Sequence, residues 1–253
     1  MKIKVLASGS KGNCTLVVSG NTKILIDAGI TETQIKNSLS ELGIDIKTLD
    51  GILISHTHSD HVRGLLQLVK RHKLKVFAHS ELVYDLINII PIESIIVVKE
   101  KFNIESLNIE LIETSHDVIS YGFVLEDIHN SLVYITDTGY INKRYYNNTK
   151  NKTVYIIETN HDEKMLMEGS YPYHLKQRVI GDKGHLSNRY AGQYLKKVIG
   201  TNTKYIFLAH ISENNNTYDL ALSQIKDELI DSNFDFEKII VAHQHEETEM
   251  IEV

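Results

Sequence analysis

Short apolar runs separated by glycine-bearing turns dominate the first part of the chain. Ile3–Ala7, Thr15–Ser19 and Lys23–Asp27 have the length and composition of β-strands. Thr33–Leu42 has apolar residues at helical spacing and is followed by Gly43, a residue type that commonly ends helices. The pattern therefore predicts three strands followed by a helix.

The next apolar run, Gly51–Ile54, is apolar throughout, which is typical of a strand covered on both faces. It leads into the histidine-rich segment His56–His61, and Val62–Val69 then has the pattern of a helix. We therefore expect the histidines to lie on a loop at the carboxyl end of a buried strand.

The second half of the chain repeats this alternation. Further strands are predicted at Ile109–Glu113, Gly122–Leu125, Ser131–Thr136, Val154–Glu158, Tyr205–Ala209 and Lys238–Ala242. Tyr171–Val179 has a helical pattern with Pro172 in its first turn. A second helix is predicted at Asn188–Val198, with Ser187 as its N-cap. Strands in both halves with helices between them predict an α/β protein in which outer helices enclose two sheets.

Composition limits the class of protein. Apolar residues make up 42% and charged residues 24%, as expected for a soluble globular chain. There is no linker or repeat, so we expect a single domain spanning residues 1–253. No apolar run is long enough for a membrane helix, and the first residues lack a signal-peptide pattern. The only cysteine, Cys14, cannot form an internal disulfide, and we expect a cytoplasmic protein.

Charge is unevenly distributed along the chain. The formal net charge is −6, which argues against a protein coated in basic residues. Between Lys143 and Lys197, however, eleven lysines and arginines face five acids. This excess is compatible either with an ordinary solvated surface or with contacts to a nucleic-acid backbone, which would weaken as salt rises.

Side chains that can bind metal are concentrated in one short segment. It contains His56, His58, Asp60 and His61. Imidazole nitrogens suit zinc, and a carboxylate oxygen also suits manganese or iron. A site with two metals needs further ligands, and three candidates come shortly after distant predicted strands. They are His116, Asp137 and His210.

These residues, in this order, resemble the motifs of the metallo-β-lactamase superfamily. Asp27 in Ile24–Gly29 matches the first motif, and His56–His61 followed by Gly64 matches the second. The third, fourth and fifth motifs are matched by His116, Asp137 and His210. The resemblance covers nearly the whole chain and implies an αββα sandwich (the metallo-β-lactamase fold, two mixed β-sheets flanked by helices) with two divalent metal ions at one edge.

The resemblance also implies a role for each ligand. One metal would be held by His56, His58 and His116, and the other by Asp60, His61 and His210. Asp137 would bridge the two metals. Asp27 would lie behind the ligands and fix their loop by hydrogen bonds. Zinc, manganese and iron all suit this ligand set.

Other segments indicate a branch of the superfamily. Ser8–Cys14, Gly184–Asn188 and Ala209–Asn215 resemble signatures of the YycJ/WalJ family, and Glu158–Asp162 is similar to another of its motifs. That family is regarded as DNA-directed nucleases, and 5′-to-3′ exonuclease activity is assigned to members. The chain has no room between Asp137 and His185 for the RNA-clamping domain of RNase J-type enzymes. It also lacks an arm like that of tRNase Z, so an RNA substrate is less well supported.

The remaining candidates concern catalysis and substrate binding. His185 directly precedes a predicted helix N-terminus, which favours a phosphate, and resembles the tRNase Z histidine that assists catalysis. We expect it to act as the acid, with Asp60 as a catalytic metal ligand. His161 is open between catalysis and structure. The candidate substrate contacts are Asn188, Ser212, Asn214 and Asn215.

The sequence thus predicts a dinuclear metal hydrolase that cleaves DNA, by attack of a metal-bridging hydroxide on phosphorus. Hydrolysis of a small ester, thioester or cyclic phosphodiester is the alternative. A non-catalytic metal-binding regulator is a third hypothesis, which loss of a ligand would favour, and no ligand is lost.

Overall fold

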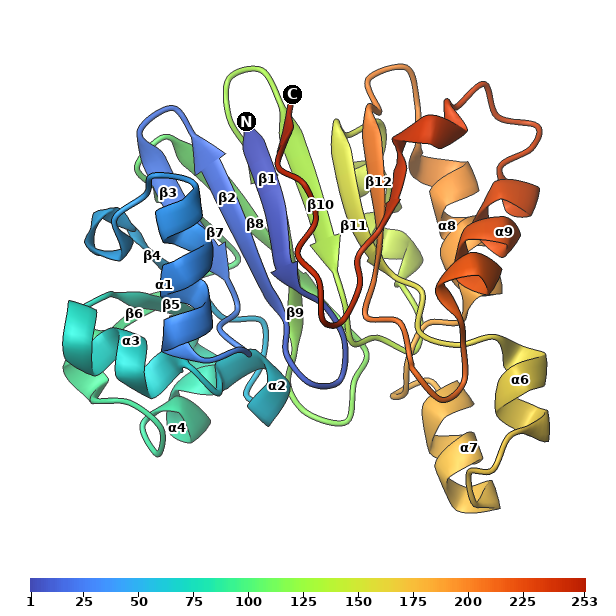
Figure 1. Cartoon of the computed structure of the whole chain (residues 1–253), viewed down its shortest axis with the longest axis horizontal. Coiled ribbons are helices and arrows are strands. Elements are labelled where there is room, and N and C mark those ends of the chain that lie inside the picture. Colours follow the sequence, from blue (N-terminus) through green and yellow to red (C-terminus); the bar gives the residue numbers. More distant parts are fainter.

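Two seven-stranded β-sheets lie face to face in the computed structural model, which describes residues 1–253 (Figure 1). In the first sheet the strand order is β14-β1-β2-β3-β4-β5-β6. Its strands are β1 (Lys2–Ala7), β2 (Cys14–Ser19), β3 (Thr22–Ile26), β4 (Gly51–Leu53), β5 (Val76–His79), β6 (Ile95–Val98) and β14 (Ile251–Glu252). The strands from β14 to β3 are antiparallel, and those from β3 to β6 are parallel.

The second sheet has the same division into an antiparallel and a parallel half. Its order is β13-β12-β11-β10-β9-β8-β7. The strands are β7 (Lys101–Ile104), β8 (Leu107–Glu113), β9 (Tyr121–Glu126), β10 (Ser131–Ile135), β11 (Val154–Glu158), β12 (Tyr205–Ala209) and β13 (Ile239–Val241). The strands from β7 to β10 are antiparallel, and those from β10 to β13 are parallel.

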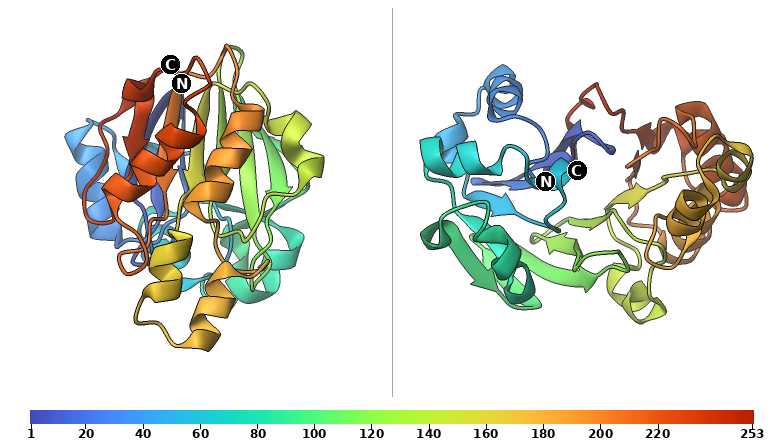
Figure 2. Two further views of the ribbon diagram at one scale, coloured as in Figure 1. Left: turned by 90° about the vertical axis from the view of Figure 1, so that its right-hand side faces the viewer. Right: turned by 90° about the horizontal axis from the view of Figure 1, so that it is seen from below.

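Helices cover the outer face of each sheet (Figures 1 and 2). On the side of the first sheet are α1 (Glu32–Glu41), α2 (Ser59–Val62), α3 (Leu65–His72) and α4 (Val83–Leu86). On the side of the second are α5 (Tyr146–Thr149), α6 (Glu163–Glu168), α7 (Tyr173–Ile180), α8 (Asn188–Val198) and α9 (Tyr218–Glu228). Single 3₁₀ turns occur at Ile46–Thr48, Ser80–Leu82, Ile92–Ser94, Lys143–Tyr145 and Phe236–Lys238. The predicted sandwich of two sheets between helices is confirmed.

The main apolar core fills the space between the sheets. Leu16 and Leu25 of the first sheet belong to the same buried cluster as Phe123 and Phe207 of the second. A smaller cluster lies between the second sheet and helices α8 and α9. Because the main cluster joins both sheets, it supports the interpretation of the chain as one domain. None of the helices is both long and apolar enough to cross a membrane.

The predicted helix Val62–Val69 is interrupted, because α2 ends at Val62 and α3 begins at Leu65. The amide of Gly64 donates to the carbonyl of Ala28 at 2.8 Å. The carbonyl of Asp60, its helical partner four residues back, accepts from the amide of Asn13 at 2.7 Å instead. A Cβ atom on Gly64 would lie 2.3 Å from the carbonyl oxygen of Ile30, so only glycine allows this close approach. The break fixes the histidine loop against the first sheet.

Candidate metal centre

The seven predicted metal ligands and Asp27 lie at one edge of the sandwich, where loops leave the carboxyl ends of strands. Asp27 follows β3, Asp137 comes shortly after β10, and His210 follows β12 directly. All three adopt left-handed backbone conformations, with φ of 59°, 54° and 54°. Such φ values are uncommon for residues other than glycine. Aspartate and histidine adopt them more often than bulkier residues do. The chain thus turns sharply where each strand ends, and this turn places the side chain at the shared edge.

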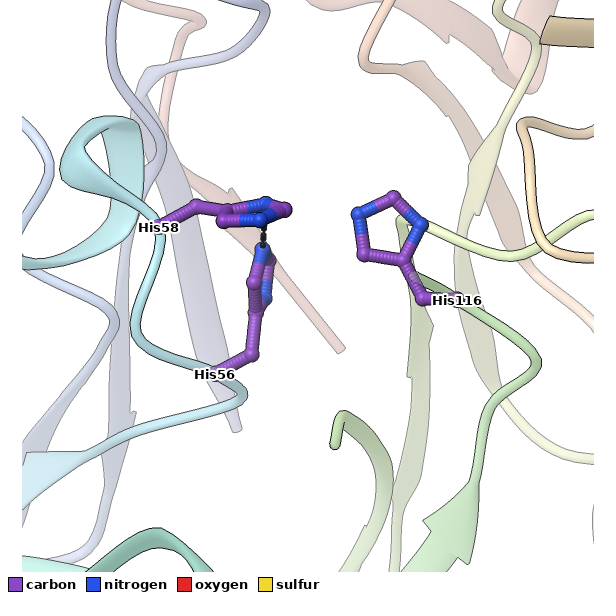
Figure 3. Close-up of side chains that lie close together, drawn as sticks. All are labelled: His56, His58 and His116. Carbon is purple, nitrogen blue, oxygen red and sulfur yellow. Dashed lines mark hydrogen bonds between the residues drawn. The ribbon is translucent and has the colours of Figure 1, made fainter. Parts of the chain in front are cut away.

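The first group of ligands contains His56, His58 and His116. One nitrogen of each ring lies within 4.8 Å of the others, a spacing that one metal ion can fill. His56 and His58 come from the loop after β4, and their Nε2 and Nδ1 atoms are 3.1 Å apart. His116 faces them from the loop between β8 and β9 (Figure 3). The group therefore joins loops from both sheets.

The second group contains Asp60, His61 and His210. Asp60 Oδ2 lies 3.5 Å from His61 Nε2 and 3.6 Å from His210 Nε2. Asp137 reaches both groups, because its Oδ2 is 3.2 Å from His61 Nε2 and its Oδ1 is 3.9 Å from His116 Nε2. The structure thus brings all seven predicted ligands together in the two predicted groups, with Asp137 between them.

Asp27 lies behind His61 and is fully buried. The Nδ1–H group of His61 donates to Asp27 Oδ2 at 2.8 Å, and the amide of Ser55 donates to Oδ1 at 2.9 Å. Because Asp27 holds the proton on Nδ1, the lone pair of His61 Nε2 points toward the second group. This is the arrangement predicted for Asp27.

Glu158, at the end of β11, holds two histidine rings in the way that Asp27 holds His61. This role was not predicted from the sequence. Its Oε1 accepts from His185 Nδ1 at 2.7 Å and from His210 Nδ1 at 3.0 Å. Its Oε2 accepts from the amides of Thr138 and Leu186 at 2.9 and 3.2 Å. Burial would raise the pKa of Glu158, but His185 and His210 outweigh it and lower the pKa to about 2. The signal available in the sequence was an acidic residue at the end of a predicted apolar strand, and the structure shows that this residue is fully buried.

The first turn of the chain, Ser8–Cys14, supports the second group. Ser8 Oγ accepts from the amide of His210 at 2.8 Å. Asn13 Nδ2 donates to Asp60 Oδ2 at 3.2 Å. Cys14 is buried and free, as predicted. The segment positions ligands without supplying one of its own.

The polar atoms at this edge suit a metal ion. His116 Nε2, Asp137 Oδ2 and His210 Nε2 are buried and have no hydrogen-bond partner within the protein. Such unpaired atoms are costly, and a coordinated cation would satisfy them. Although burial disfavours a charged imidazole, Asp137 together with Asp60 and Glu158 raises the pKa of His210 to about 10. The carboxylates therefore favour positive charge at this nitrogen, whether it is a proton or a divalent metal ion.

His185 lies beside the metal ligands and is partly open to solvent. Its side chain is 24% exposed, and its Nδ1 is held by Glu158. Burial would lower its pKa, but Glu158 and Asp137 raise it. Ser187 caps α8 by accepting from the amide of Tyr190, as predicted. His185 is thus accessible to solvent, its ring is held by Glu158, and it lies near the N-terminus of α8.

His161 has no such access. His161 is only 1% exposed, and neither of its ring nitrogens has a hydrogen-bond partner. Burial lowers the pKa of His161 to about 4, so the ring is neutral at pH 7. The structure does not bring it into either ligand group. Of the two roles that the sequence left open, burial favours the structural one.

The four candidate substrate contacts differ in position. Asn188 is fully buried, and its amide donates to Asn216 and Gln224, so it packs α8 against the α9 region and offers no surface to substrate. Ser212 is also buried and accepts from the amides that follow it. Asn215 is buried, with its Oδ1 unpaired. Asn214 is exposed and donates to Tyr171, and it alone remains a candidate contact.

Comparisons with known proteins agree with this geometry. A family model described as the metallo-beta-lactamase superfamily matches residues 7–210. The exodeoxyribonuclease WalJ of Streptococcus pneumoniae is 35% identical over 230 residues, which cover 87% of this chain and 85% of the relative. The exodeoxyribonuclease YycJ of Bacillus anthracis is 33% identical over 240 residues, with 92% and 91% covered.

A solved structure shows the same fold. The metallo-beta-lactamase fold protein YhfI of Bacillus subtilis has a TM-score of 0.75 to this chain at 17% identity, covering 98% of this chain and 99% of YhfI. The family model and the two relatives, which match most of this chain, show the family. This protein belongs to the metallo-β-lactamase superfamily and, within it, to the YycJ/WalJ family.

Proposed function

We propose that this protein is a metal-dependent exodeoxyribonuclease that hydrolyses DNA from the 5′ end. The observation that carries the proposal is the pair of ligand groups that share Asp137, with a partly exposed histidine, His185, at their side. The relatives named exodeoxyribonuclease, similar over most of their length, support DNA as the substrate. The proposal places the protein in the cytoplasm, where its single buried cysteine would stay reduced.

The residues would hold two divalent metal ions. His56, His58 and His116 suit one ion, Asp60, His61 and His210 suit the other, and Asp137 suits both. When bound, a pair of such ions lowers the pKa of water toward neutrality and neutralises charge on the phosphoryl group. This donor set accepts zinc, manganese and iron.

The chain itself supplies orientation and a proton. Asp27 and Glu158 fix the rings of His61 and His210 so that Nε2 of each faces the ligand group. Because Glu158 also binds His185 Nδ1, Nε2 of His185 is free to donate a proton to the departing sugar oxygen. The N-terminus of α8, two residues further on, favours a phosphate nearby.

The test is digestion of DNA labelled at the 5′ or 3′ end, as single strands and as duplex, with labelled RNA alongside. Protein loaded with manganese or zinc should shorten DNA stepwise from the 5′ end. Asp60→Ala should lose this activity with its metal. If the loaded wild-type protein cuts no polynucleotide but hydrolyses a thioester, the proposal is wrong and the small-substrate alternative is favoured.

The role of His185 has a sharper test. A general acid contributes about 10²–10⁴-fold to rate when the leaving group is a sugar alkoxide. A chromogenic phosphodiester with a nitrophenol leaving group needs little protonation. His185→Ala should therefore lose much more activity on DNA than on the chromogenic diester, whereas equal losses on both would contradict its role as acid.

A further inference from the structure

Asp117, the residue after His116, connects the metal ligands to helix α7. Its Oδ1 lies 3.3 Å from His116 Nε2 and 3.4 Å from His58 Nε2. Its Oδ2 accepts from the guanidinium of Arg178 at 2.5 Å. Through this one carboxylate, an arginine of α7 is held next to the first ligand group.

Arg178 is held in place yet remains available. Its side chain is 63% exposed, and Asp117 is its hydrogen-bond partner within the protein. A guanidinium has five N–H donors in a planar fork, so most of them face solvent here. Because Asp117 restricts the long side chain, less rotamer freedom is lost when the remaining donors bind a ligand.

Helix α7 has no buried residue, so apolar burial alone does not account for its position. Figure 1 shows it projecting beyond the sandwich at the same end as α2. Polar contacts hold it there, including Lys176 Nζ to the carbonyl of Met167 at 2.7 Å and the amide of His185 to the carbonyl of Val179 at 2.9 Å. Leu175 and Val179 are only half-buried, so these polar contacts help to place α7 beside the metal ligands and also position Arg178 and His185.

The packing below α7 is close. A Cβ atom on Gly184 would lie 2.1 Å from the carbonyl oxygen of Val179, and one on Gly139 would lie 2.2 Å from that of Asp182. Asp182 belongs to the loop that carries His185, and Gly139 comes two residues after Asp137. The His185 loop therefore packs directly against the Asp137 loop. Arg178, at the end of α7, is thus fixed relative to the metal ligands on two sides, through Asp117 and through these glycines.

We propose that Arg178, held by Asp117, forms a phosphate-binding site for the DNA strand beside the metal ligands. The proposal rests on the proposed nuclease function and adds to it the side chain that binds the backbone. A guanidinium matches two oxygens of a phosphate, and the side chain of Arg178 is largely exposed. The ligand is a backbone phosphate, so the contact carries no base preference.

The experiment measures binding of a fluorescent phosphorothioate oligonucleotide, which resists cleavage, to the metal-loaded full-length protein at several salt concentrations. Arg178→Gln should weaken binding about ten-fold and lower the slope of log affinity against log salt by about one contact. Arg178→Lys keeps the charge and should recover part of the loss. Arg71→Gln is the matched control, because Arg71 is 61% exposed and paired with one carboxylate, that of Glu32. It should bind as the wild type does.

A second variant separates phosphate binding from a structural ion pair. If Arg178 served only to pair with Asp117, then Asp117→Asn and Arg178→Gln would weaken binding equally. If Arg178 binds phosphate, Asp117→Asn should retain much more affinity, because the guanidinium remains and a negative charge is removed. Equal losses, or an unchanged Arg178→Gln variant of a protein that cuts DNA, would overturn this inference alone. A wild-type protein that neither binds nor cuts DNA would instead overturn the proposed function.

Discussion

At the scale of single residues, buried carboxylates decide which nitrogen of each histidine is free. Asp27 accepts a hydrogen bond from Nδ1–H of His61, and Glu158 accepts from Nδ1–H of His185 and of His210. The carbonyl of Gly184 lies 3.3 Å from His116 Nδ1 and has the same effect there. Nε2 of His61, His116 and His210 is thereby left facing the ligand groups, and we expect the groups behind these rings to influence metal affinity.

Asp27→Asn tests this influence with little change in shape. Asparagine tolerates the left-handed φ of 59° at this position. Its amide would donate to His61 Nδ1, which moves the ring proton to Nε2 and blocks the metal-binding lone pair. We expect metal affinity to fall about 10–100-fold, measured by competition with a chromogenic chelator. Tyr134→Phe, which removes only a 3.4 Å hydrogen bond to Asp27, is the control. Equal affinity of Asp27→Asn and wild type would contradict the argument.

Glu158→Gln should be more damaging, because the carboxylate accepts from four N–H groups at once. They belong to His185, His210, Thr138 and Leu186. A glutamine keeps one oxygen, so two donors would face its NH₂ group unsatisfied, at a cost of about 1–3 kcal/mol each. We expect a lower free energy of unfolding in denaturant and loss of nuclease activity. Glu163→Gln weakens the pairing with exposed Arg189 but keeps an oxygen that can accept from Ser187, so it should change stability by less than about 1 kcal/mol. Similar stabilities of both variants would refute this reasoning.

The sequence predicted that seven candidate metal ligands and Asp27 belong to one site because they match ordered motifs, and the structure brings these residues together. Their convergence could be inferred because each lies near a strand end. Glu158 was missed because its role depends on contacts with His185 and His210, which lie 27 and 52 residues away. Asn188 was misassigned for the same reason, since burial against Asn216 and Gln224 is a tertiary property.

At the scale of elements, Glu32 links α1 to α3. Its carboxylate accepts from His72 Nε2 at 2.7 Å and Arg71 Nη1 at 3.0 Å. The hydrogen bond from His72, with the charge of Arg71, lowers the pKa of Glu32. A lowered folded-state pKa stabilises the fold above the ordinary glutamate pKa, and this stabilisation disappears as pH falls through the folded-state value.

Glu32→Gln should therefore lower the free energy of unfolding by about 1–2 kcal/mol at pH 7. The difference from wild type should shrink as the pH falls below about 4.5, the ordinary value. Urea unfolding at pH 7, 5 and 3.5 measures it. Glu41→Gln, at the exposed end of the same helix, is the control and should change the free energy of unfolding by less than about 0.5 kcal/mol. A difference for Glu32→Gln that is as large at pH 3.5 as at pH 7 would rule out the ionised carboxylate as its source.

Elements with strong local signals were predicted well. The strands Val154–Glu158 and Tyr205–Ala209 and the helix Asn188–Val198 have the predicted bounds. Strands β5 to β7 were not predicted, and β6 is a short, partly exposed edge strand whose partner, β5, begins some twenty residues earlier. The break between α2 and α3 depends on the carbonyls of Ala28 and Ile30, which local sequence does not reveal.

At the scale of the whole molecule, the metal site joins the two sheets. His56, His58, Asp60 and His61 come from loops of the first sheet, and His116, Asp137 and His210 come from loops of the second. Each ligand group takes side chains from both sides. Bound cations would therefore connect the halves of the sandwich as well as satisfy buried atoms that otherwise lack partners.

Removing metal should accordingly destabilise the whole fold. Ions at about a thousand times their Kd add about 4 kcal/mol per site, which raises Tm by about 10 °C in a chain of this size. We expect chelation by EDTA to lower Tm by at least that amount, and manganese or zinc to restore it. His56→Ala should shrink the effect of EDTA, whereas His129→Ala, an exposed histidine in the turn after β9, should not. If EDTA removes the metal but leaves Tm unchanged, the ions do not hold the two sheets together. The buried Nε2 atoms of His116 and His210, which have no hydrogen-bond partner in the protein, would then not be stabilised by these ions.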